Sequence, residues 1–416
     1  MNTVLFEDDC VEQLCPITLT RPAYAITCGS LRLVDLAKRI DEDLRGVVRS
    51  YLRDFQQDYA VDDSPPLTAN QTAKTLWLNA RIIPDAAWLE PLRQKVAAGK
   101  PFRIMSGERV VAALTVGTTP FDDDNWNRDA VGSFLAAADG PDESADDIPL
   151  MLANYPHEII AQHKLLTAGN LEFILANHPF REIADGVFST HEMSPPDHVA
   201  FDTSAGPVLI GEGVNFGAFS VINGPVSIGN GTRITPHTLL KGPVSVGHTT
   251  KLGGEIGSSV IDPYSNKVHF GYLGSSWLGS WINLGAGTTN SNLKNTYGSI
   301  RVEYAGQKID TGLQFLGCVI GDFTKTAIHT AIYTGKILGV CSNVYGTVTE
   351  NVPSFANYAR SLGDITEHPA DVMKVTQKRC FARRGIEQLP RHTQLLDDIY
   401  TIESPKRKLV NKALSL

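Results

Sequence analysis

The sequence predicts an α/β domain, then a parallel β-helix, then a helical C-terminal extension. Three observations lead to this prediction. In residues 1–190, short apolar strands alternate with amphipathic helical stretches, which is typical of α/β layers. From residue 201 an apolar residue recurs at every sixth position, and that period indicates stacked repeats. Residues 351–416 return to helical spacing. We therefore place the domains at 1–195, 201–350 and 351–416.

Several elements of the first domain follow from their apolar periodicity. Strands are predicted at Thr3–Phe6, Thr75–Leu78 and Arg109–Leu114. Helices are predicted at Ser30–Ile40, Ala86–Ala98 and Tyr155–Asn177. The polar stretches Ser64–Asn70 and Gly140–Asp147 are predicted to be loops.

The second domain carries the strongest repeat. Eight apolar residues in succession are six apart, and the beat resumes further on: Ile210, Phe216, Ile222, Ile228, Ile234, Leu240, Val246, Leu252, then Leu278 and Leu284, then Ile320, Thr326, Ile332, Leu338 and Val344. A helix of 3.6 residues per turn cannot keep this period on one face. A β-sandwich leaves the small and polar residues between these positions unexplained. A triangular β-helix, with one inward apolar residue per side, accounts for both.

Two stretches interrupt the beat. We expect Ser258–Val268 and Thr288–Gly312 to form loops on one face of the coil, because interruptions in a solenoid often carry the binding site. Ala370–Arg384 and Arg391–Thr401 are predicted helices. We expect them to cap the last coil, whose sheet edge would otherwise be open.

Composition excludes several classes of protein. The net charge is −8 and no basic stripe is present, so nucleic acid is not expected as a partner. Lys406–Lys408 is interpreted as a solvated tail. The six cysteines contain no C-x-x-C pair, and neither a secretory signal nor a membrane-spanning run is expected. These features favour the cytoplasm and no membrane association.

His269 is the candidate for chemistry in the β-helix. Transfer of an acyl group to an amine needs a base near neutral pKa, and histidine fits that need. The glycines Gly271 and Gly274 leave room for a ligand. The Asn283 amide, or a backbone N–H at Gly285 or Ala286, is suited to hold the oxyanion of the tetrahedral intermediate. Neutral and cationic side chains nearby fit a sugar phosphate: Asn266, Lys267, Asn290, Asn292 and Lys294.

Residues 205–350 resemble the acetyltransferase half of the bifunctional N-acetylglucosamine-1-phosphate uridyltransferase/glucosamine-1-phosphate acetyltransferase. That enzyme family carries His-x-x-Tyr-Leu-Gly followed by Asn-x-Gly-Ala-Gly-Thr, matched here by His269–Gly274 and Asn283–Thr288. The resemblance implies a left-handed coil, acetyl-CoA as cosubstrate and His269 as general base. It also implies Tyr272 and Asn283 at the acceptor sugar, Ala286 near the thioester, and a homotrimer with shared sites.

Nearly the whole chain resembles a bifunctional UDP-N-acetylglucosamine diphosphorylase/glucosamine-1-phosphate N-acetyltransferase-like family. The motifs that carry this resemblance are Leu5–Asp8, Thr20–Pro22, Lys251–Glu255, Ser265–His269, Asn283–Thr288 and Asn292–Asn295. It implies a sugar nucleotidyltransferase-like, Rossmann-like first domain.

The sequence departs from the family in both halves. By repeat register, the positions of two basic residues that hold the sugar phosphate in the family fall near Thr235 and Gly253 here, and neither residue is basic, so Arg233, Lys251 or Lys267 would have to compensate. The first domain lacks the glycine-rich loop that cradles a nucleotide. Arg21, Lys38 and Asn79 are its candidate nucleotide contacts. The sequence defines no metal site, and Mg²⁺ is expected only if this half is active.

The sequence therefore predicts an acetyl-CoA-dependent N-acetyltransferase acting on an amino-sugar phosphate or a nucleotide sugar, alone or together with sugar-1-phosphate nucleotidyl transfer. Two alternatives stay open. One is a nucleotidyltransferase with a structural β-helix. The other is a non-catalytic scaffold that binds a sugar nucleotide.

Overall fold

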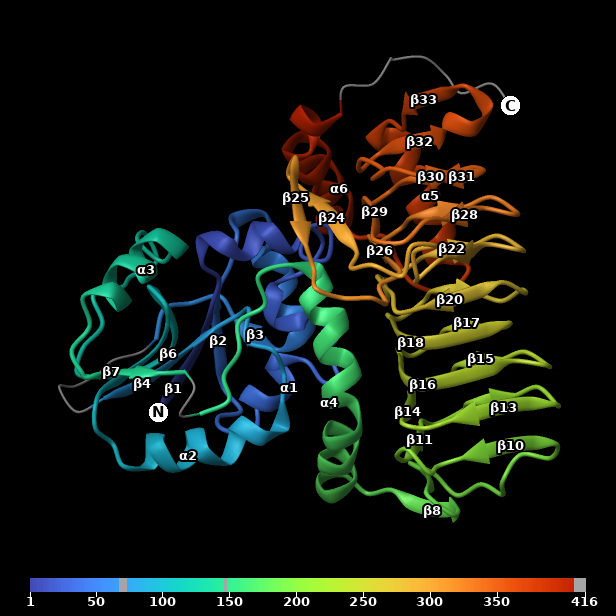
Figure 1. The fold of residues 1–416 in the computed structure, drawn as a ribbon. Helices are drawn as coiled ribbons and strands as arrows, with labels where there is room; N and C mark the ends of the chain where they lie inside the picture. Colours follow the sequence, from blue (N-terminus) through green and yellow to red (C-terminus); the bar gives the residue numbers. More distant parts are fainter. Residues whose placement is uncertain (67–72, 146–147, 408–416) are drawn as a thin grey trace. The chain divides into compact units, whose positions relative to one another are not determined.

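The computed structural model describes residues 1–66, 73–145 and 148–407. It divides into two compact units, Met1–Ile159 and Ile160–Leu416 (Figure 1). Residues 67–72, 146–147 and 408–416 lie outside the described part. They include the end of each of the two predicted N-terminal loops, and Lys408.

The first unit is built on a seven-stranded sheet in the order β3-β2-β1-β4-β6-β5-β7. Only β6 runs antiparallel to its neighbours, β4 and β5. The chain fills the sheet on one side of β1 and then on the other, so the switch point lies between β1 and β4. The strands are β1 (Asn2–Phe6), β2 (Leu44–Val47), β3 (Val61–Asp62), β4 (Lys74–Asn79), β5 (Phe102–Ser106), β6 (Arg109–Val116) and β7 (Asp142–Ser144).

The three predicted strands are confirmed as β1, β4 and β6, and the helices are corrected in part. The helix predicted at Ser30–Ile40 is only α1 (Leu33–Ala37), because Ser30 adopts a positive φ of 67° and Cys28 bridges to Leu31. Ala86–Ala98 begins as a 3₁₀ turn and continues as α2 (Leu89–Ala97). The loop predicted at Gly140–Asp147 contains β7. The helix predicted at Tyr155–Asn177 is confirmed as α4 (Pro156–Asn177), which begins at the end of this unit and continues into the second. The remaining α-helix in the described part of the first unit is α3 (Arg128–Ala136), in addition to the 3₁₀ helices Asp9–Leu14, Ala23–Ala25 and Ser50–Tyr59.

The second unit is a parallel β-helix whose coils stack along one axis, from β10 to β32 (Figure 1). Its first side contains β12 (Asn215–Phe216), β15 (Arg233–Ile234), β17 (Lys251–Leu252), β19 (Asn266–Lys267), β22 (Asn283–Leu284), β27 (Lys325–Thr326), β30 (Asn343–Val344) and β32 (Ala356–Ala359). Its second side contains β10 (Val199–Asp202), β13 (Ser220–Asn223), β20 (Tyr272–Gly274), β23 (Thr289–Asn290), β28 (Ala331–Ile332) and β31 (Thr347–Val348).

The third side contains β9 (Val187–Ser189), β11 (Val208–Ile210), β14 (Val226–Ile228), β21 (Trp277–Leu278), β26 (Cys318–Ile320) and β29 (Lys336–Leu338). Two long strands run through both the second and third sides: β16 (Leu239–Val246) and β18 (Glu255–Ile261). The first coil is preceded by β8 (Arg181–Ala184), which pairs antiparallel with β9.

The apolar residues of the six-residue repeat occupy the inward positions of the coils, as predicted. Nearly all of these apolar residues are buried in one continuous core, for example Ile234, Leu252 and Leu284. The interruption at Ser258–Val268 is not a loop, which corrects the prediction. The register pairs Ile234 with Leu252, 18 residues on, and then Leu252 with Lys267, only 15 residues on. The chain stays in the ladder, but a shortened coil moves Lys267 to an inward position.

The second interruption leaves the coil, as predicted, and returns at β26. It is not wholly irregular, because it holds an antiparallel hairpin of β24 (Arg301–Tyr304) and β25 (Gln307–Asp310). The alternating apolar residues Val302 and Tyr304 are buried and give the hairpin one packed face.

The two predicted C-terminal helices are α5 (Ala370–Ala382) and α6 (Pro390–Ile402). The prediction that these helices cover the last coil holds in part: Tyr400 of α6 packs on Phe355, while the strand edge of the first side is paired by β33 (Asp364–Glu367), which runs antiparallel to β32. Phe381 of α5 packs on the flank of the coil instead, against Trp281 and Phe323. The prediction that Lys406–Lys408 is a solvated tail is wrong in part, since Arg407 is buried against Tyr400 and pairs with Glu367.

Two general properties agree with the composition. All six cysteines are free thiols. In the described part of the chain, every helix is too short or too polar to cross a bilayer.

Candidate functional site

His269 lies at the corner between the first and second sides of its coil, between β19 and β20, and its side chain is exposed. The Gly285–Thr288 turn stacks directly on this corner, because Gly287 N donates to the carbonyl oxygen of Phe270 at 3.1 Å. The two motifs that the sequence singled out are therefore neighbours in adjacent coils. An imidazole open to solvent beside this glycine-rich turn can accept a proton from a bound ligand.

Lys267 sits inside the coil beneath His269, with 2% of its surface exposed. Its Nζ donates to the carbonyl oxygen of Gly253 at 2.8 Å and to that of His269 at 2.5 Å. Burial lowers the pKa of this ammonium from 10.5 to about 8. The ammonium ties the His269 main chain to the preceding coil, and it does not face solvent as a phosphate ligand would.

Small residues around the corner are required by close backbone packing. A side chain at Gly271, which has a φ of 125°, would place its Cβ 2.1 Å from the carbonyl oxygen of Thr288. At Gly253 a Cβ would lie 1.8 Å from the carbonyl oxygen of Val268. A basic side chain therefore does not fit at Gly253.

The two backbone candidates for the oxyanion donor, Gly285 N and Ala286 N, differ in their hydrogen bonding. Gly285 N already donates to the carbonyl oxygen of Thr326 at 3.1 Å and to its Oγ1 at 3.0 Å. Ala286 N has no acceptor within the described ranges, while its carbonyl oxygen accepts from His329 N at 2.7 Å. Of the two, Ala286 is therefore the donor available to a ligand.

Tyr272 and Asn292 form a pair on the second side. Asn292 Nδ2 donates to the Tyr272 hydroxyl at 2.9 Å and to Ser275 Oγ at 3.3 Å. The hydroxyl lies over Gly274, where an added Cβ would be 2.0 Å away. Burial, together with the charge of Glu255, raises the pKa of the Tyr272 hydroxyl. Tyr272 therefore offers a neutral hydroxyl.

Asn266 and Asn283 face outward at matching positions of adjacent coils on the first side, because β19 pairs with β22 there. Asn266 Nδ2 is 3.5 Å from Asn283 Oδ1. Lys251 occupies the same position one coil earlier. Lys294 is elsewhere, in the loop after β23, where its Nζ donates to the carbonyl oxygen of Ser299 at 2.8 Å. Asn290 is buried and bonds both backbone groups of Gly274, so it is structural.

One residue at this face was missed by the sequence interpretation. Arg384, just after α5, donates from Nη2 to Asn266 Oδ1 at 3.0 Å. The two residues are 118 positions apart, and no local pattern signals such a contact.

The nucleotide candidates of the first unit are held in internal contacts. Asn79 is fully buried, and its Nδ2 donates to Asp8 Oδ2 at 2.9 Å and to the carbonyl oxygen of Val110 at 3.1 Å. Lys38 Nζ donates to the carbonyl oxygen of Tyr59 at 2.7 Å. Arg21 is 6% exposed, and its carbonyl oxygen accepts from Arg49 Nη2 at 3.1 Å. Of the three, Asn79 is the last residue of β4, and its bond to Asp8 links that strand to the segment after β1.

An ion pair occupies the switch point between these strands. Arg81 donates to both carboxylate oxygens of Asp8 at 2.7 Å. Burial opposes ionisation, but the bonds and charge of Arg81 hold the pKa of Asp8 below its usual range. Asp8, Asp9 and Cys10 place their ligand atoms within 4.8 Å of one another. The group does not fit Mg²⁺, because Asp8 is engaged by Arg81, Asp9 pairs with Arg109, and a thiol is a poor magnesium ligand.

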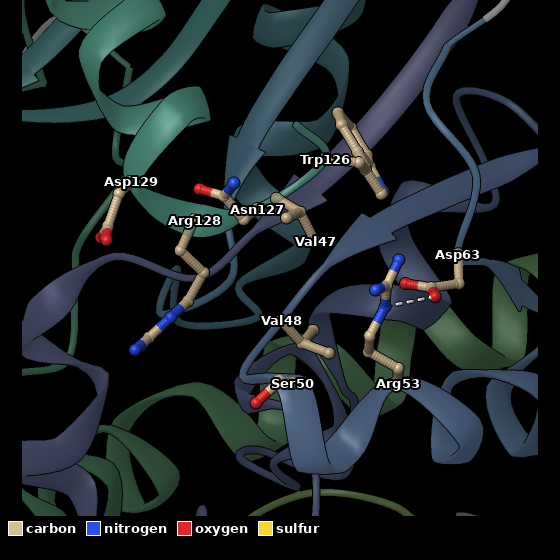
Figure 2. Close-up of a pocket in the computed structure, with 9 residues that line it drawn as sticks. All are labelled: Val47, Val48, Ser50, Arg53, Asp63, Trp126, Asn127, Arg128 and Asp129. Atoms are coloured by element: carbon tan, nitrogen blue, oxygen red, sulfur yellow. Dashed lines mark hydrogen bonds and ion pairs between the residues drawn. The ribbon is translucent and has the colours of Figure 1, made fainter. Parts of the chain in front are cut away.

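The first unit also contains a cavity of about 220 Å³ at the carboxyl end of β2 and the start of α3. Figure 2 shows Arg53 and Asp63, joined by an ion pair of 2.7 Å, below the indole of Trp126. The indole Nε1 is buried and has no hydrogen-bond partner in the described chain. The lining residues are Val47, Val48, Ser50, Arg53, Asp63, Trp126, Asn127, Arg128 and Asp129.

Comparison with known proteins finds relatives for both units. Residues 3–174 match a family described as sugar nucleotidyl transferase, and residues 207–242 match bacterial transferase hexapeptide repeats. A bifunctional sugar-1-phosphate nucleotidylyltransferase/acetyltransferase of Sulfurisphaera tokodaii is 33% identical over 91 residues, 22% of this chain and 23% of that protein.

The bifunctional protein GlmU of Methanococcus vannielii is 34% identical over 85 residues, 20% of each chain. The chain thus aligns with about a fifth of the length of these relatives.

Two solved acyltransferase structures match this chain at low identity and low TM-score. The UDP-N-acetylglucosamine acyltransferase of Francisella novicida is 13% identical, with 53% of this chain and 79% of that chain covered and a TM-score of 0.30. The Arabidopsis UDP-N-acetylglucosamine acyltransferase is 14% identical, with coverages of 50% and 92% and a TM-score of 0.21.

Proposed function

We propose that this chain, which joins a sugar nucleotidyltransferase domain to hexapeptide transferase repeats, is an acetyl-CoA-dependent N-acetyltransferase. Its acceptor is an amino-sugar phosphate or a nucleotide sugar. The observation that carries the proposal is the stacking of the Gly285–Thr288 turn on the His269 corner, through the bond between Gly287 N and Phe270 O. That contact brings a base, an open backbone donor and small residues to one place.

The reaction follows from these groups. The amino nitrogen of the acceptor attacks the thioester carbonyl carbon, and His269 takes a proton from that nitrogen. The carbonyl oxygen becomes an oxyanion, which the N–H of Ala286 stabilises. When the C–S bond breaks, the CoA thiolate leaves and the proton held by His269 neutralises it. The products are an amide and CoA thiol.

The remaining residues orient the acceptor. The Asn283 side chain is outward and exposed one coil above Asn266, where its amide can accept from or donate to the amino sugar. Tyr272, held by Asn292, presents a neutral hydroxyl on the adjoining side. Lys267 positions His269 and is not assigned to the substrate.

We also propose a homotrimer with sites shared between subunits. Exposed apolar side chains follow the corner that carries His269: Phe219 is 63% exposed, Phe270 62% and Ile328 68%. A row of this kind suits burial against a second copy of the chain.

A release assay tests the activity. Acetyl-CoA and a panel of hexosamine phosphates should yield one CoA thiol per acetylated amine, and the N-acetylated sugars should give none. Absence of thiol release with folded protein that binds acetyl-CoA by calorimetry would favour the scaffold alternative.

Sugar-1-phosphate nucleotidyl transfer is the second candidate, favoured by the family match of residues 3–174. The cavity beside Trp126 offers a polar and aromatic site of the size of a small ligand. The ion pair at the switch point and the misfit of the acidic cluster to Mg²⁺ weigh against this candidate. Pyrophosphate release from a nucleoside triphosphate and a sugar 1-phosphate would support it. No release across a panel of nucleotides would leave the first unit a binding domain.

A further inference from the structure

We propose that Arg384 completes an anion site on the first side of the β-helix, together with Arg233 and Lys251, and that this site binds the phosphate of the acceptor. This inference rests on the proposed acetyltransfer. It supplies the cationic contacts that are absent at Thr235 and Gly253.

The register of the first side brings the cations together. Arg233 pairs with Lys251, Lys251 with Asn266, and Asn266 with Asn283. The next residues in three of these coils, Ile234, Leu252 and Leu284, are buried, so the members of this column point outward. Neighbouring coils are about 5 Å apart. The long side chains of Lys251, one coil before Asn266, and of Arg233, two coils before it, can therefore reach the same ligand as Asn266.

Arg384 is fixed in place by the packing of α5. Phe381, three residues earlier, is 4% exposed and has ring centroids 4.6 Å from Trp281 and 6.2 Å from Phe323. After the helix, Ile386 N donates to the carbonyl oxygen of Phe381 at 3.0 Å, and Gly385 adopts a φ of 69°. This closed turn holds Arg384 against Asn266, with Nη2 on the amide oxygen.

The cations of this face have no carboxylate partner in the part of the chain that the structure describes. Within the described residues, Arg233, Lys251 and Arg384 form no ion pair with a carboxylate. Lys325, one coil beyond Asn283, is bonded through Nζ to the carbonyl oxygen of Phe323 at 2.8 Å, and burial lowers its pKa. A set of unpaired cations in a chain of net charge −8 favours an anionic ligand.

The chemistry fits a phosphate on the acceptor. The guanidinium has five N–H donors in a planar fork that matches phosphate oxygens, and one of them is used by Asn266. The neighbour of Asn266 in the ladder is Asn283, which the proposed function assigns to the acceptor. The phosphates of CoA share this chemistry and must be separated by experiment.

Calorimetry on the full-length protein tests the site. The ligands are a hexosamine 1-phosphate, the unphosphorylated hexosamine and CoA, and the variants are Arg384→Ala and Arg384→Lys. Arg383→Ala is the matched control, because Arg383 is exposed and adjacent. We expect Arg384→Ala to weaken binding of the phosphorylated sugar about tenfold and to change the affinity for the unphosphorylated sugar and for CoA little. Arg384→Lys should lose less affinity for the phosphorylated sugar.

The proposal would be overturned if Arg384→Ala lost the same affinity for the phosphorylated and the unphosphorylated sugar, because that result indicates a structural role through Asn266. A loss of affinity for CoA alone, or no loss for any of the three ligands, would overturn it as well. Intact phosphate-dependent binding in a protein that releases no thiol would contradict the proposed acetyltransfer and leave the anion site standing.

Discussion

The ammonium of Lys267 donates to the main-chain carbonyl of His269 from inside the coil, at 2.5 Å. A lysine in the inward column between Leu252 and Leu284 is an unusual placement, because burial disfavours its charge. Its second bond, to Gly253, links the same corner to the preceding coil. The corner that presents the proposed base is thus held by a buried cation.

Replacing Lys267 by Met should change the pH dependence of stability. The pKa of Lys267 falls from 10.5 to about 8 in the folded chain, so between these values the unfolded chain binds more protons and stability rises with pH. Below pH 8 the cost of burying the charge, about 3 kcal/mol, is fully present. Denaturant unfolding at pH 7 and pH 10.5 should therefore show a smaller rise for Lys267→Met than for the wild type.

The same variant should lower turnover about tenfold, because a corner released from Lys267 no longer fixes His269. Unfolding curves with the same pH dependence in both proteins would contradict the burial of the charge. Unchanged turnover would contradict the positioning role.

Two glycines at matched positions test the Tyr272 contact. Gly257 and Gly274 pair in adjacent coils. A Cβ at Gly274 would lie 2.0 Å from the Tyr272 hydroxyl, whereas at Gly257 the nearest atoms are 3.6 Å away. Gly274→Ala should displace Tyr272, break its bond to Asn292 and raise KM for the acceptor about tenfold. Gly257→Ala should leave KM unchanged, and equal kinetics in the two variants would contradict this account.

Phe219→Asp tests the proposed trimer at a distance from the chemistry. Phe219 stacks between the rings of His198 and His237, on coils that precede the His269 corner. A charge there should dissociate the assembly and lower activity, because each site needs a neighbour. Light scattering measures the mass, and Val372→Asp on α5, where Val372 is 52% exposed, is the control. A trimeric, fully active Phe219→Asp variant would rule out this interface.

Much of the β-helix could be predicted from the sequence, because each inward residue repeats a local pattern. The neighbouring positions of His269 and Gly285–Thr288 followed from the same repeat. The inward position of Lys267 could not be predicted, since a coil of 15 residues breaks the six-residue repeat and changes which residue points inward. Arg384 was beyond reach because its contact depends on how Phe381 docks α5 on Trp281. The Asp8–Arg81 pair joins segments 73 residues apart, and it too has no local signature.

The most direct test of the central claim is the rate of CoA thiol release by His269→Ala, measured beside His248→Ala. His248 is an exposed histidine at another corner of the β-helix, between β16 and β17, and it belongs neither to the proposed site nor to the proposed trimer contact. We predict that His269→Ala lowers kcat by about 10²–10⁴ with the unfolding free energy unchanged, and that His248→Ala keeps wild-type turnover. Wild-type turnover by folded His269→Ala would contradict the assignment of His269 as the general base.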